Sequence, residues 1–287
     1  MPNIKVVGIM GKPGIPHASA IVSELMDWLK GRGVEARLDS ETAFYLRRSD
    51  GLPREKVPEG TQLVIVLGGD GTLLAAARAV AGRVIPIFPV NLGGLGFLTA
   101  ITLDQLYPEL ERAFRGEQRV VPRKMLHGEL VRDGQTFKSY AALNDIVIAK
   151  TQIARMIDLE THVDEQYVGT FKADGLIVAT PTGSTAYSLS AGGPIVYPLV
   201  AAICITPVCP HMLTNRPVLV PDNMVIQIIC RAEDGQAFLT VDGQVGEPLR
   251  YEDRIICRSS EHSVHLIRPP KMFFFDVLRQ KLKWGER

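Results

Sequence analysis

The stretch that decides the fold reads Leu63-Val64-Ile65-Val66-Leu67-Gly68-Gly69-Asp70-Gly71-Thr72. Its first five residues are apolar and rich in β-branched side chains, which is typical of a buried strand. Residues 73–80 follow and are rich in Ala and Leu, so they predict a helix. Glycines let the turn between strand and helix approach a ligand closely, and the first amides of a helix are unpaired donors. The turn therefore suits a phosphate group, which would meet Gly68, Gly69, Gly71 and Thr72.

Asp70 is the acidic residue of this turn. A carboxylate beside a polyphosphate is repelled unless it holds a cation or takes a proton from an attacking hydroxyl, and both tasks belong to phosphoryl transfer. The alternative is that Asp70 only caps the following helix, as aspartate commonly does. The local sequence leaves both interpretations open.

The composition favours an ordinary globular protein. The chain has 287 residues, which exceeds the usual size of one domain, so two domains are expected. Its content of 46% hydrophobic and 22% charged residues is unremarkable for this class. With 32 basic and 31 acidic residues the net charge is +1, so we expect neither a nucleic acid nor a membrane as partner.

The sequence predicts a cytoplasmic protein. Its first eight residues lack the basic and apolar regions of a signal peptide. The most apolar long window, Ile195 to Cys209, contains two prolines and is too short for a membrane span. The four cysteines form no Cys-x-x-Cys pair, and we interpret them as reduced thiols.

The first part of the chain alternates between strand-like and helix-like segments, which predicts a parallel sheet with helices on its faces. Ligands of such sheets bind beyond the carboxyl ends of the strands, where Asp70 falls. The polar connection at residues 41–60 contains two prolines and is predicted to be irregular. The predicted strands are residues 4–10, 34–38, 63–67 and 84–88, and the predicted helices are residues 17–31, 73–80 and 103–116.

The pattern changes near Arg123, where short strand-like runs begin to alternate with Asp-Gly pairs that favour tight turns. We therefore predict an α/β domain at residues 1–122 and an all-β, sandwich-like domain at residues 123–268. The apolar, mildly helical tail at residues 269–287 is expected to pack back on the body or on another subunit. The strand candidates of the second domain are residues 143–148, 156–163, 176–179, 224–230 and 237–241.

The most unusual passage runs from Phe171 to Pro194, where an apolar strand leads into a cluster of hydroxyls and glycines. Its hydroxyls offer donors and acceptors close together, as a ribose or a phosphate needs. The alternative is a surface loop rich in serine and threonine. The hydroxyls in question belong to Thr180, Thr182, Ser184 and Thr185.

Asn144 and Asp145 interrupt another apolar run and need partners if they are buried. They mark either a hairpin corner or bulge, or a pair of side chains that reads a ring or a sugar.

Other common site motifs fail on spacing. Gly11-Lys12-Pro13 lacks the hydroxyl that follows the lysine of a P-loop, and residues 93–96 do not fit the dinucleotide fingerprint. Thr182-Gly183-Ser184 is not a nucleophile elbow. The histidines show no metal-ligand spacing, so no metal site made by the protein alone is predicted.

Several motifs occur together and in a fixed order, and with them the chain resembles the bacterial NAD kinases from about residue 63 to about residue 244. Gly-Gly-Asp-Gly alone also occurs in diacylglycerol and sphingosine kinases and in phosphofructokinases, whereas the run that begins at Thr180 is much more specific. The motifs are Gly68-Gly69-Asp70-Gly71-Thr72, Asn91-Leu92-Gly93-Gly94-Leu95-Gly96-Phe97-Leu98, Asn144-Asp145, Asp174-Gly175, Thr180-Pro181-Thr182-Gly183-Ser184-Thr185-Ala186-Tyr187 with its continuation to Pro194, Pro210-His211 and Arg216-Pro217.

The resemblance implies an α/β domain and a β-sandwich domain with NAD between them. It implies that ATP, or polyphosphate in some members, phosphorylates the 2′-hydroxyl of the adenosine ribose, which gives NADP and ADP. A divalent metal ion such as Mg²⁺ is the implied cofactor. The family forms homodimers and homotetramers, so a homo-oligomer is expected.

The resemblance also assigns residues. Asp70 is implied to be the general base that takes the proton of the 2′-hydroxyl, and Phe97 is implied to stack near the adenine. Phe88-Pro89-Val90 departs from the residues that commonly precede Asn91 in the family. The implied substrate-binding positions are Asp70, Gly71, Phe97, Asn144, Asp145, Arg155, Lys172, Asp174, Thr182, Thr185, Ala186, Tyr187, Ser188, Leu189, Ser190 and Gln244.

Two other functions compete with this interpretation. Another ATP-dependent kinase of the same superfamily, acting on a lipid or a sugar, needs the turn at Asp70 but not the passage that begins at Thr180. A non-catalytic sensor would bind NAD without turnover and has no evident need for an acidic residue at position 70.

Overall fold

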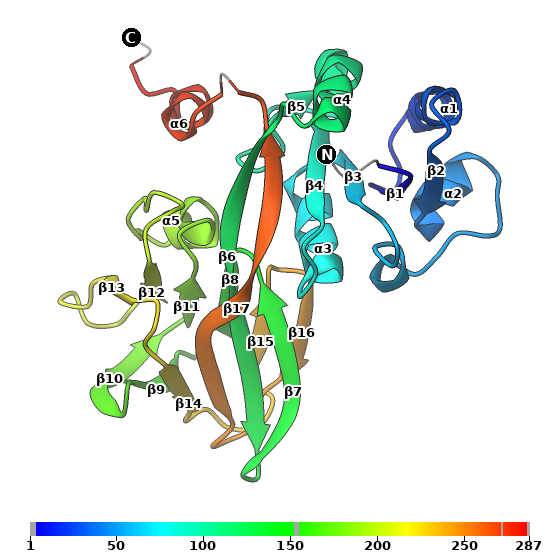
Figure 1. Ribbon diagram of the computed structural model, residues 1–287. Coiled ribbons are helices and arrows are strands. Elements are labelled where there is room, and N and C mark those ends of the chain that lie inside the picture. Colours follow the sequence, from blue (N-terminus) through cyan, green and yellow to red (C-terminus); the bar gives the residue numbers. More distant parts are fainter. Residues whose placement is uncertain (1–3, 152–154, 271, 286–287) are drawn as a thin grey trace. The chain divides into compact units, whose positions relative to one another are not determined.

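The computed structural model describes residues 4–151, 155–270 and 272–285, and the chain divides into two compact units (Figure 1). The first unit comprises residues 1–122 and 264–287, and the second comprises residues 123–263. The chain therefore leaves the first unit once and returns to it. Strands β6 (Arg119–Arg132) and β17 (Arg254–Arg268) contain the two crossing points.

A parallel sheet forms the centre of the first unit. Its strands lie in the order β2, β1, β3, β4, and the end of β17 runs parallel to β4 on the far side. The short strand β5 also pairs with β4. The bounds are Val6–Gly11 for β1, Glu35–Leu38 for β2, Leu63–Gly68 for β3, Pro86–Asn91 for β4 and Ile101–Thr102 for β5.

Helices cover this sheet because they carry apolar faces. In α1 the buried residues Val22, Leu25 and Leu29 recur at helical spacing, and they share one core with Ile65 of β3 and Phe88 of β4. Among the described residues no helix is both long and apolar enough to cross a membrane. The helices are α1 (Ala18–Lys30), α2 (Ser40–Tyr45), α3 (Asp70–Val80), α4 (Leu106–Arg115) and α6 (Phe274–Leu282), with 3-10 turns at Arg54–Lys56 and Leu103–Gln105.

The connection at residues 41–60 is more regular than predicted, since it holds most of α2 and a 3-10 turn. Asp39 is buried, and its Oδ1 accepts hydrogen bonds from the amides of Thr42 (2.8 Å) and Gly11 (3.3 Å). Its Oδ2 accepts a hydrogen bond from Arg54 Nε at 2.9 Å. The prediction of an irregular connection was wrong at residues 41–45 and 54–56. The sequence did not show that Asp39, besides capping α2 through Thr42, also binds the distant residues Gly11 and Arg54.

Two antiparallel sheets make up the second unit. One has six strands in the order β13, β12, β11, β8, β15, β16. In the other, β10, β9, β14 and the start of β17 lie side by side, and the hairpin of β6 and β7 joins through β17. The remaining bounds are β7 (Gln135–Ala142), β8 (Asp145–Lys150), β9 (Ile157–Val163), β10 (Gln166–Ala173), β11 (Gly175–Ala179), β12 (Ala202–Val208), β13 (Val218–Pro221), β14 (Ile226–Cys230), β15 (Ala237–Val241) and β16 (Val245–Pro248), with a 3-10 turn at Gly183–Thr185 and the short helix α5 (Tyr187–Ser190).

A shared apolar core shows that these two sheets form a sandwich. Ile148 and Val178 of the six-stranded sheet belong to the same buried cluster as Leu159, Ile228 and Ile255 of the other sheet. Alternate residues of β9 are buried, as expected for a strand with one face on a core. The predicted fold class, an α/β domain with a parallel sheet followed by a β-sandwich, is therefore confirmed.

Replacing Asp39 by alanine tests what holds the first unit together. Asp39→Ala removes the cap of α2 and the carboxylate partner of Arg54, so we expect the free energy of unfolding to fall by about 2–4 kcal/mol. The measurement is urea denaturation followed by tryptophan fluorescence, because Trp28 and Trp284 both lie in this unit.

Asp50→Ala is the matched control, since the ion pair of Asp50 with Arg48 lies in the same segment but is exposed. We expect it to leave the unfolding curve unchanged. An equal loss of stability in both variants would contradict the role given to Asp39.

Candidate active site

The carboxyl ends of three parallel strands meet at one edge of the first unit. Gly11 at the end of β1 lies opposite Leu67 of β3, and Gly68 at the end of β3 lies opposite Asn91 at the end of β4. The turn that begins at Gly68 therefore lies beside the segments that follow β1 and β4. Ligands of open parallel sheets bind at such an edge.

The turn is tight because its first glycine has no room for a side chain. A Cβ on Gly68 would lie 2.4 Å from Thr72 Oγ1 and 3.0 Å from Lys12 Cβ. Gly69 is the N-cap of α3, with extended backbone and without a side-chain cap, and Asp70 is the first residue of the helix. The capping alternative for Asp70 therefore does not hold, and its carboxylate bonds elsewhere.

The carboxylate of Asp70 holds a loop of the first unit. Its Oδ2 accepts a hydrogen bond from the amide of Phe97 at 2.9 Å. Its Oδ1 accepts hydrogen bonds from the amides of Leu98 at 3.1 Å and Thr99 at 3.0 Å, and from Thr99 Oγ1 at 2.9 Å. Asp70 is half-buried, so these bonds form in partly desolvated surroundings, where charge-assisted hydrogen bonds are strong.

The same loop is fixed from its other side. Asn91 is buried, and its Nδ2 donates to Gly94 O at 2.8 Å and to Thr99 Oγ1 at 2.8 Å, while its Oδ1 accepts from the amide of Gly93 at 2.7 Å. Arg268 near the end of the chain donates from Nη2 to Phe97 O at 2.7 Å. The loop is therefore tied to β4, to α3 and to the end of β17.

Phe97 and Gly96 lie at the point where this loop meets Asp70. The ring of Phe97 is half-buried, and Lys281 Nζ of α6 lies 5.8 Å from its centroid. A Cβ on Gly96 would lie 2.1 Å from Asp70 Oδ1 and 2.3 Å from Thr99 Oγ1. Only glycine therefore lets the loop approach the carboxylate this closely.

A second aspartate organises the polar residues of the second unit. Asp242 accepts hydrogen bonds from three successive amides, those of Leu143 (3.1 Å), Asn144 (2.8 Å) and Asp145 (3.2 Å). Its own amide donates to Asp145 O at 2.9 Å. The sequence indicates only a tight turn at Asp242 and Gly243, because the amides that Asp242 binds lie about a hundred residues earlier in the chain.

Asn144 has a buried amide oxygen that lacks a hydrogen-bond partner within the described part of the chain. Its backbone oxygen accepts from the amide of Thr180 at 2.9 Å, and a Cβ on Gly183 would lie 2.1 Å from that oxygen. The start of β8 and the hydroxyl-rich passage are therefore in close contact. A buried polar atom without a partner usually marks the place of a ligand or an ordered water.

Asp145, the first residue of β8, is buried next to Asp242. Burial, followed by the negative charge of Asp242, raises the pKa of Asp145 to about 7. The carboxyl group of Asp145 therefore titrates near neutral pH, unlike that of an ordinary aspartate.

Much of the hydroxyl-rich passage stabilises itself. Thr180 Oγ1 donates to Leu143 O at 2.6 Å, and Ser184 Oγ donates to Pro181 O at 2.7 Å and accepts from the amide of Val196 at 2.9 Å. Ser188 is buried, with its Oγ at 2.9 Å from Thr206 Oγ1. The hydroxyls of Thr180, Ser184 and Ser188 thus position the backbone of the passage. Tyr187 and Ser190 are exposed, Thr185, Ala186 and Leu189 are half-buried, and Thr182 is buried.

The other predicted positions of the second unit are spread over several strands. Asp174, between β10 and β11, pairs with Lys150 at an N···O distance of 2.6 Å. Lys172, Arg155 and Gln244 are exposed. Among the described residues, no group of three or more His, Cys, Asp or Glu side chains could hold a metal ion.

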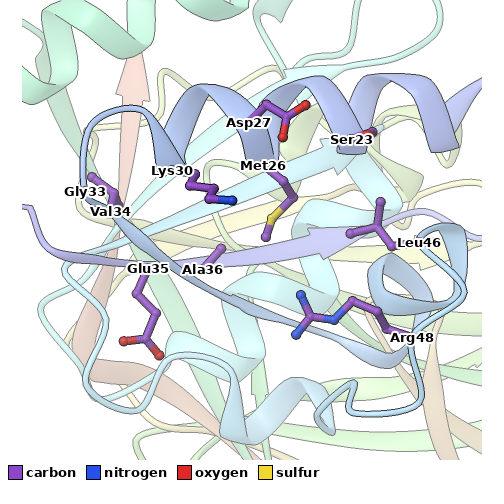
Figure 2. A pocket seen from close by; sticks show the side chains of 10 residues that line it. All are labelled: Ser23, Met26, Asp27, Lys30, Gly33, Val34, Glu35, Ala36, Leu46 and Arg48. Atoms are coloured by element: carbon purple, nitrogen blue, oxygen red, sulfur yellow. The ribbon is translucent and has the colours of Figure 1, made fainter.

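A separate cavity of about 680 Å³ lies in the first unit beside α1 and β2 (Figure 2). None of the predicted site residues lines it, and its lining charges have both signs. The exposed guanidinium of Arg48, one of its lining residues, is paired with Asp50. The candidate active site is therefore not this cavity. Its lining residues are Ser23, Met26, Asp27, Lys30, Gly33, Val34, Glu35, Ala36, Leu46 and Arg48.

Comparison with known proteins decides the family. A family model for the ATP-NAD kinase N-terminal domain matches residues 7–118, and one for the ATP-NAD kinase C-terminal domain matches residues 143–269. A curated NAD kinase of Solibacter usitatus is 61% identical over 287 residues, which is 100% of both chains. One of Koribacter versatilis is 50% identical and covers 99% of this chain and 100% of its own. The chain belongs to the ATP-NAD kinase family.

Solved structures of the NAD kinase family have the same architecture. A yeast NADH kinase complexed with NADH has a TM-score of 0.92 at 26% identity, and the match covers 100% of this chain and 90% of that chain. An NAD kinase of Archaeoglobus fulgidus in complex with ATP has a TM-score of 0.78 at 27% identity, with 97% and 98% covered. The resemblance drawn from the sequence motifs is thereby confirmed.

Gly96→Ala tests the close packing of the loop on Asp70. The added methyl group must displace the carboxylate or the Thr99 hydroxyl, so we expect kcat to fall by about 10²-fold, since a misplacement of about 1 Å can cost an enzyme this much even when the mutated residue lies far from the chemistry. Steady-state kinetics and thermal unfolding are the measurements. Gly94→Ala is the control because a Cβ there meets no atom within 4 Å. A parent-like kcat in Gly96→Ala would contradict the contact.

Asp145→Asn tests the raised pKa through protein stability. An unfolded aspartate loses its proton near pH 4, whereas folded Asp145 keeps it until about pH 7, so the folded parent loses stability as the pH rises between these values. Asparagine carries no such cost. We expect the gain in unfolding free energy from Asp145→Asn to be about 2–3 kcal/mol larger at pH 8 than at pH 5. Urea denaturation followed by circular dichroism measures it, and a gain independent of pH would contradict the shift.

Proposed function

We infer that this protein is an NAD kinase, which catalyses ATP-dependent phosphorylation of NAD to NADP. Identity of 61% along the full length of a curated NAD kinase carries this conclusion. Both halves of the chain match the corresponding halves of the family. A kinase for a lipid or a sugar, the first competing function, would have no reason to match the family's C-terminal domain. The sensor hypothesis does not account for the 61% identity with a curated NAD kinase.

We further propose that Asp70 is the general base of the transfer. The observation that supports it is a carboxylate at the first residue of α3, held at the carboxyl edge of the sheet by the loop at residues 97–99. A ribose hydroxyl is a poor nucleophile, so a carboxylate that takes its proton during in-line attack assists the reaction.

The phosphates of ATP would meet the turn at Gly68 and Gly69. The N-terminus of α3 presents the positive end of the helix dipole there, which favours negative charge. Lys12 follows β1, its side chain is exposed, and its Cβ packs beside Gly68. We therefore assign Lys12, which the sequence analysis set aside with the failed P-loop motif, as a cation for the donor phosphates.

A divalent ion such as Mg²⁺ fits this donor set only as a companion of ATP. Kinases commonly hold Mg²⁺ through one or two carboxylates together with the nucleotide phosphates, and the ion neutralises charge on those phosphates. The described residues offer no larger group of carboxylates and imidazoles. We therefore propose that the phosphates of ATP supply most of the ligands.

The polar residues of the second unit are proposed to bind the dinucleotide. Asn144 supports this most directly, since its buried Oδ1 has no partner among the described residues and would accept a hydrogen bond from a base or a sugar. Asp145 would accept from ribose hydroxyls in its ionised form. The other proposed contacts of the second unit are Arg155, Lys172, Asp174, Thr182, Thr185, Ala186, Tyr187, Ser188, Leu189, Ser190 and Gln244, and those of the first unit are Gly71 and Phe97.

We also propose a homodimer or homotetramer in the cytoplasm. Strand β13 is an edge strand whose Val218 and Leu219 are exposed, and an exposed apolar edge is suited to association. The four cysteines are all free thiols, which fits a reducing compartment.

Asp70→Asn tests the role of the base. We expect kcat to fall by about 10²–10⁴-fold, because proton removal acts only in the transition state. Asparagine has one acceptor oxygen where aspartate has two, so at least one loop amide loses its acceptor, and thermal unfolding is measured beside kcat to separate a disturbed loop from the loss of the base. The assay incubates the protein with ATP and NAD and measures NADP with an NADP-specific dehydrogenase.

Asp104→Asn serves as the control for Asp70→Asn, since Asp104 is an exposed acid in the first turn of another helical segment of the same unit. It should retain the parent kcat. A parent-like kcat in Asp70→Asn itself would overturn the assignment of the base.

A further inference from the structure

The carboxylate of Asp70 stands at the end of a buried chain of polar side chains. Asn91 is 5% exposed and Thr99 is 0% exposed. Asn91 Nδ2 lies 2.8 Å from Thr99 Oγ1, which lies 2.9 Å from Asp70 Oδ1. The three side chains come from the end of β4, the loop after it and the start of α3.

The direction of the protons along this chain follows from the partners of Asn91. Its Oδ1 accepts from the amide of Gly93, and its Nδ2 donates to the carbonyl of Gly94, so the orientation of the amide group is fixed. The nitrogen can only donate, so the hydroxyl of Thr99 accepts from it. The single hydroxyl proton of Thr99 is then directed to Asp70.

The two oxygens of Asp70 consequently differ. Oδ1 accepts from two amides and from the Thr99 hydroxyl, whereas Oδ2 accepts only from the amide of Phe97 among the bonds of the described residues. A carboxylate oxygen has two lone pairs in its plane, so the three donors at Oδ1 exceed its in-plane acceptor sites, whereas Oδ2, with one donor, keeps one.

We propose that Thr99 is a positioning residue for phosphoryl transfer. Thr99, whose hydroxyl accepts from Asn91, donates a third hydrogen bond to Oδ1 of Asp70 beside the two loop amides, and so favours Oδ2, which has one donor, as the oxygen that takes the proton. This inference rests on the proposed role of Asp70 as the base. It adds which oxygen acts and which residue selects it.

The O–H bond of the 2′-hydroxyl breaks and its proton goes to Oδ2 of Asp70. The hydroxyl oxygen forms a new bond to the γ-phosphorus of ATP, and the bond between that phosphorus and the bridging oxygen breaks. The electron pair of the broken bond leaves with ADP. Thr99 keeps its own proton throughout.

Thr99→Val tests the proposal, since valine has nearly the same shape and lacks the hydroxyl. We expect kcat to fall by about 10–100-fold, while the KM values for NAD and ATP change by less than about threefold, because the hydroxyl acts on the base and not on a bound substrate. Thr99→Ser restores the hydroxyl and should recover kcat to within about threefold of the parent. If Thr99→Val does not fold, Thr99→Ala removes the same hydroxyl without β-branching.

Thr61→Val is the matched structural control. Thr61 is a buried threonine of the same unit, and its Oγ1 donates to Pro58 O at 3.0 Å. Thermal unfolding should shift similarly in Thr61→Val and Thr99→Val. Only Thr99→Val should lose kcat, so an equal loss of kcat in Thr61→Val would assign the effect to stability and overturn the proposal.

A double-variant cycle separates the failure of this proposal from the failure of the base assignment. In the Asp70→Asn background, Thr99→Val should have no further effect on kcat, because Thr99 acts through Asp70. If Asp70→Asn alone retains kcat, the base assignment fails. If Asp70→Asn loses kcat but Thr99→Val does not, or serine fails to restore it, or the two losses multiply, the base assignment stands and the positioning role is overturned.

Discussion

An aspartate that accepts hydrogen bonds from three successive backbone amides organises the candidate site in each unit. Asp70 holds the amides of residues 97–99, and Asp242 holds those of residues 143–145. A loop with buried amides needs such an acceptor, because each unpaired donor would cost about 1–3 kcal/mol. The glycine at position 96 follows from this constraint, since a Cβ there would collide with the carboxylate that the loop binds.

The sequence predicts well those strands and helices whose signal lies in their own residues. The apolar run at residues 63–67 and the Ala-rich segment after it carry their own strand and helix signals, and the structure has β3 and α3 there. Strands with one solvated face lack that signal. The first five residues of β7 are exposed, and no apolar pattern marked them. Helix α2 depends on Asp39, whose partner Arg54 lies fifteen positions further along.

Some residues of the candidate site can likewise be predicted from the sequence, and others cannot. A carboxylate in a glycine turn is visible in the sequence, and Asp70 lies where that pattern placed it, at the carboxyl edge of a parallel sheet. The partners of the hydroxyl-rich passage are not visible. Ser188 bonds to Thr206 of β12, and Thr180 to the carbonyl of Leu143, so their inward orientation depends on contacts far along the chain. For the same reason Thr99 and Asp242 escaped notice.

The interruption of the first unit by the second affects the order in which the two units can fold during synthesis. The first unit is interrupted by residues 123–263, and Arg268, which binds the carbonyl of Phe97, lies beyond the interruption. During translation the ribosome must therefore release the whole second unit before the last strand of the parallel sheet can be added. The turn and the loop are synthesised early, but the arginine that binds the loop follows only after residues 123–263.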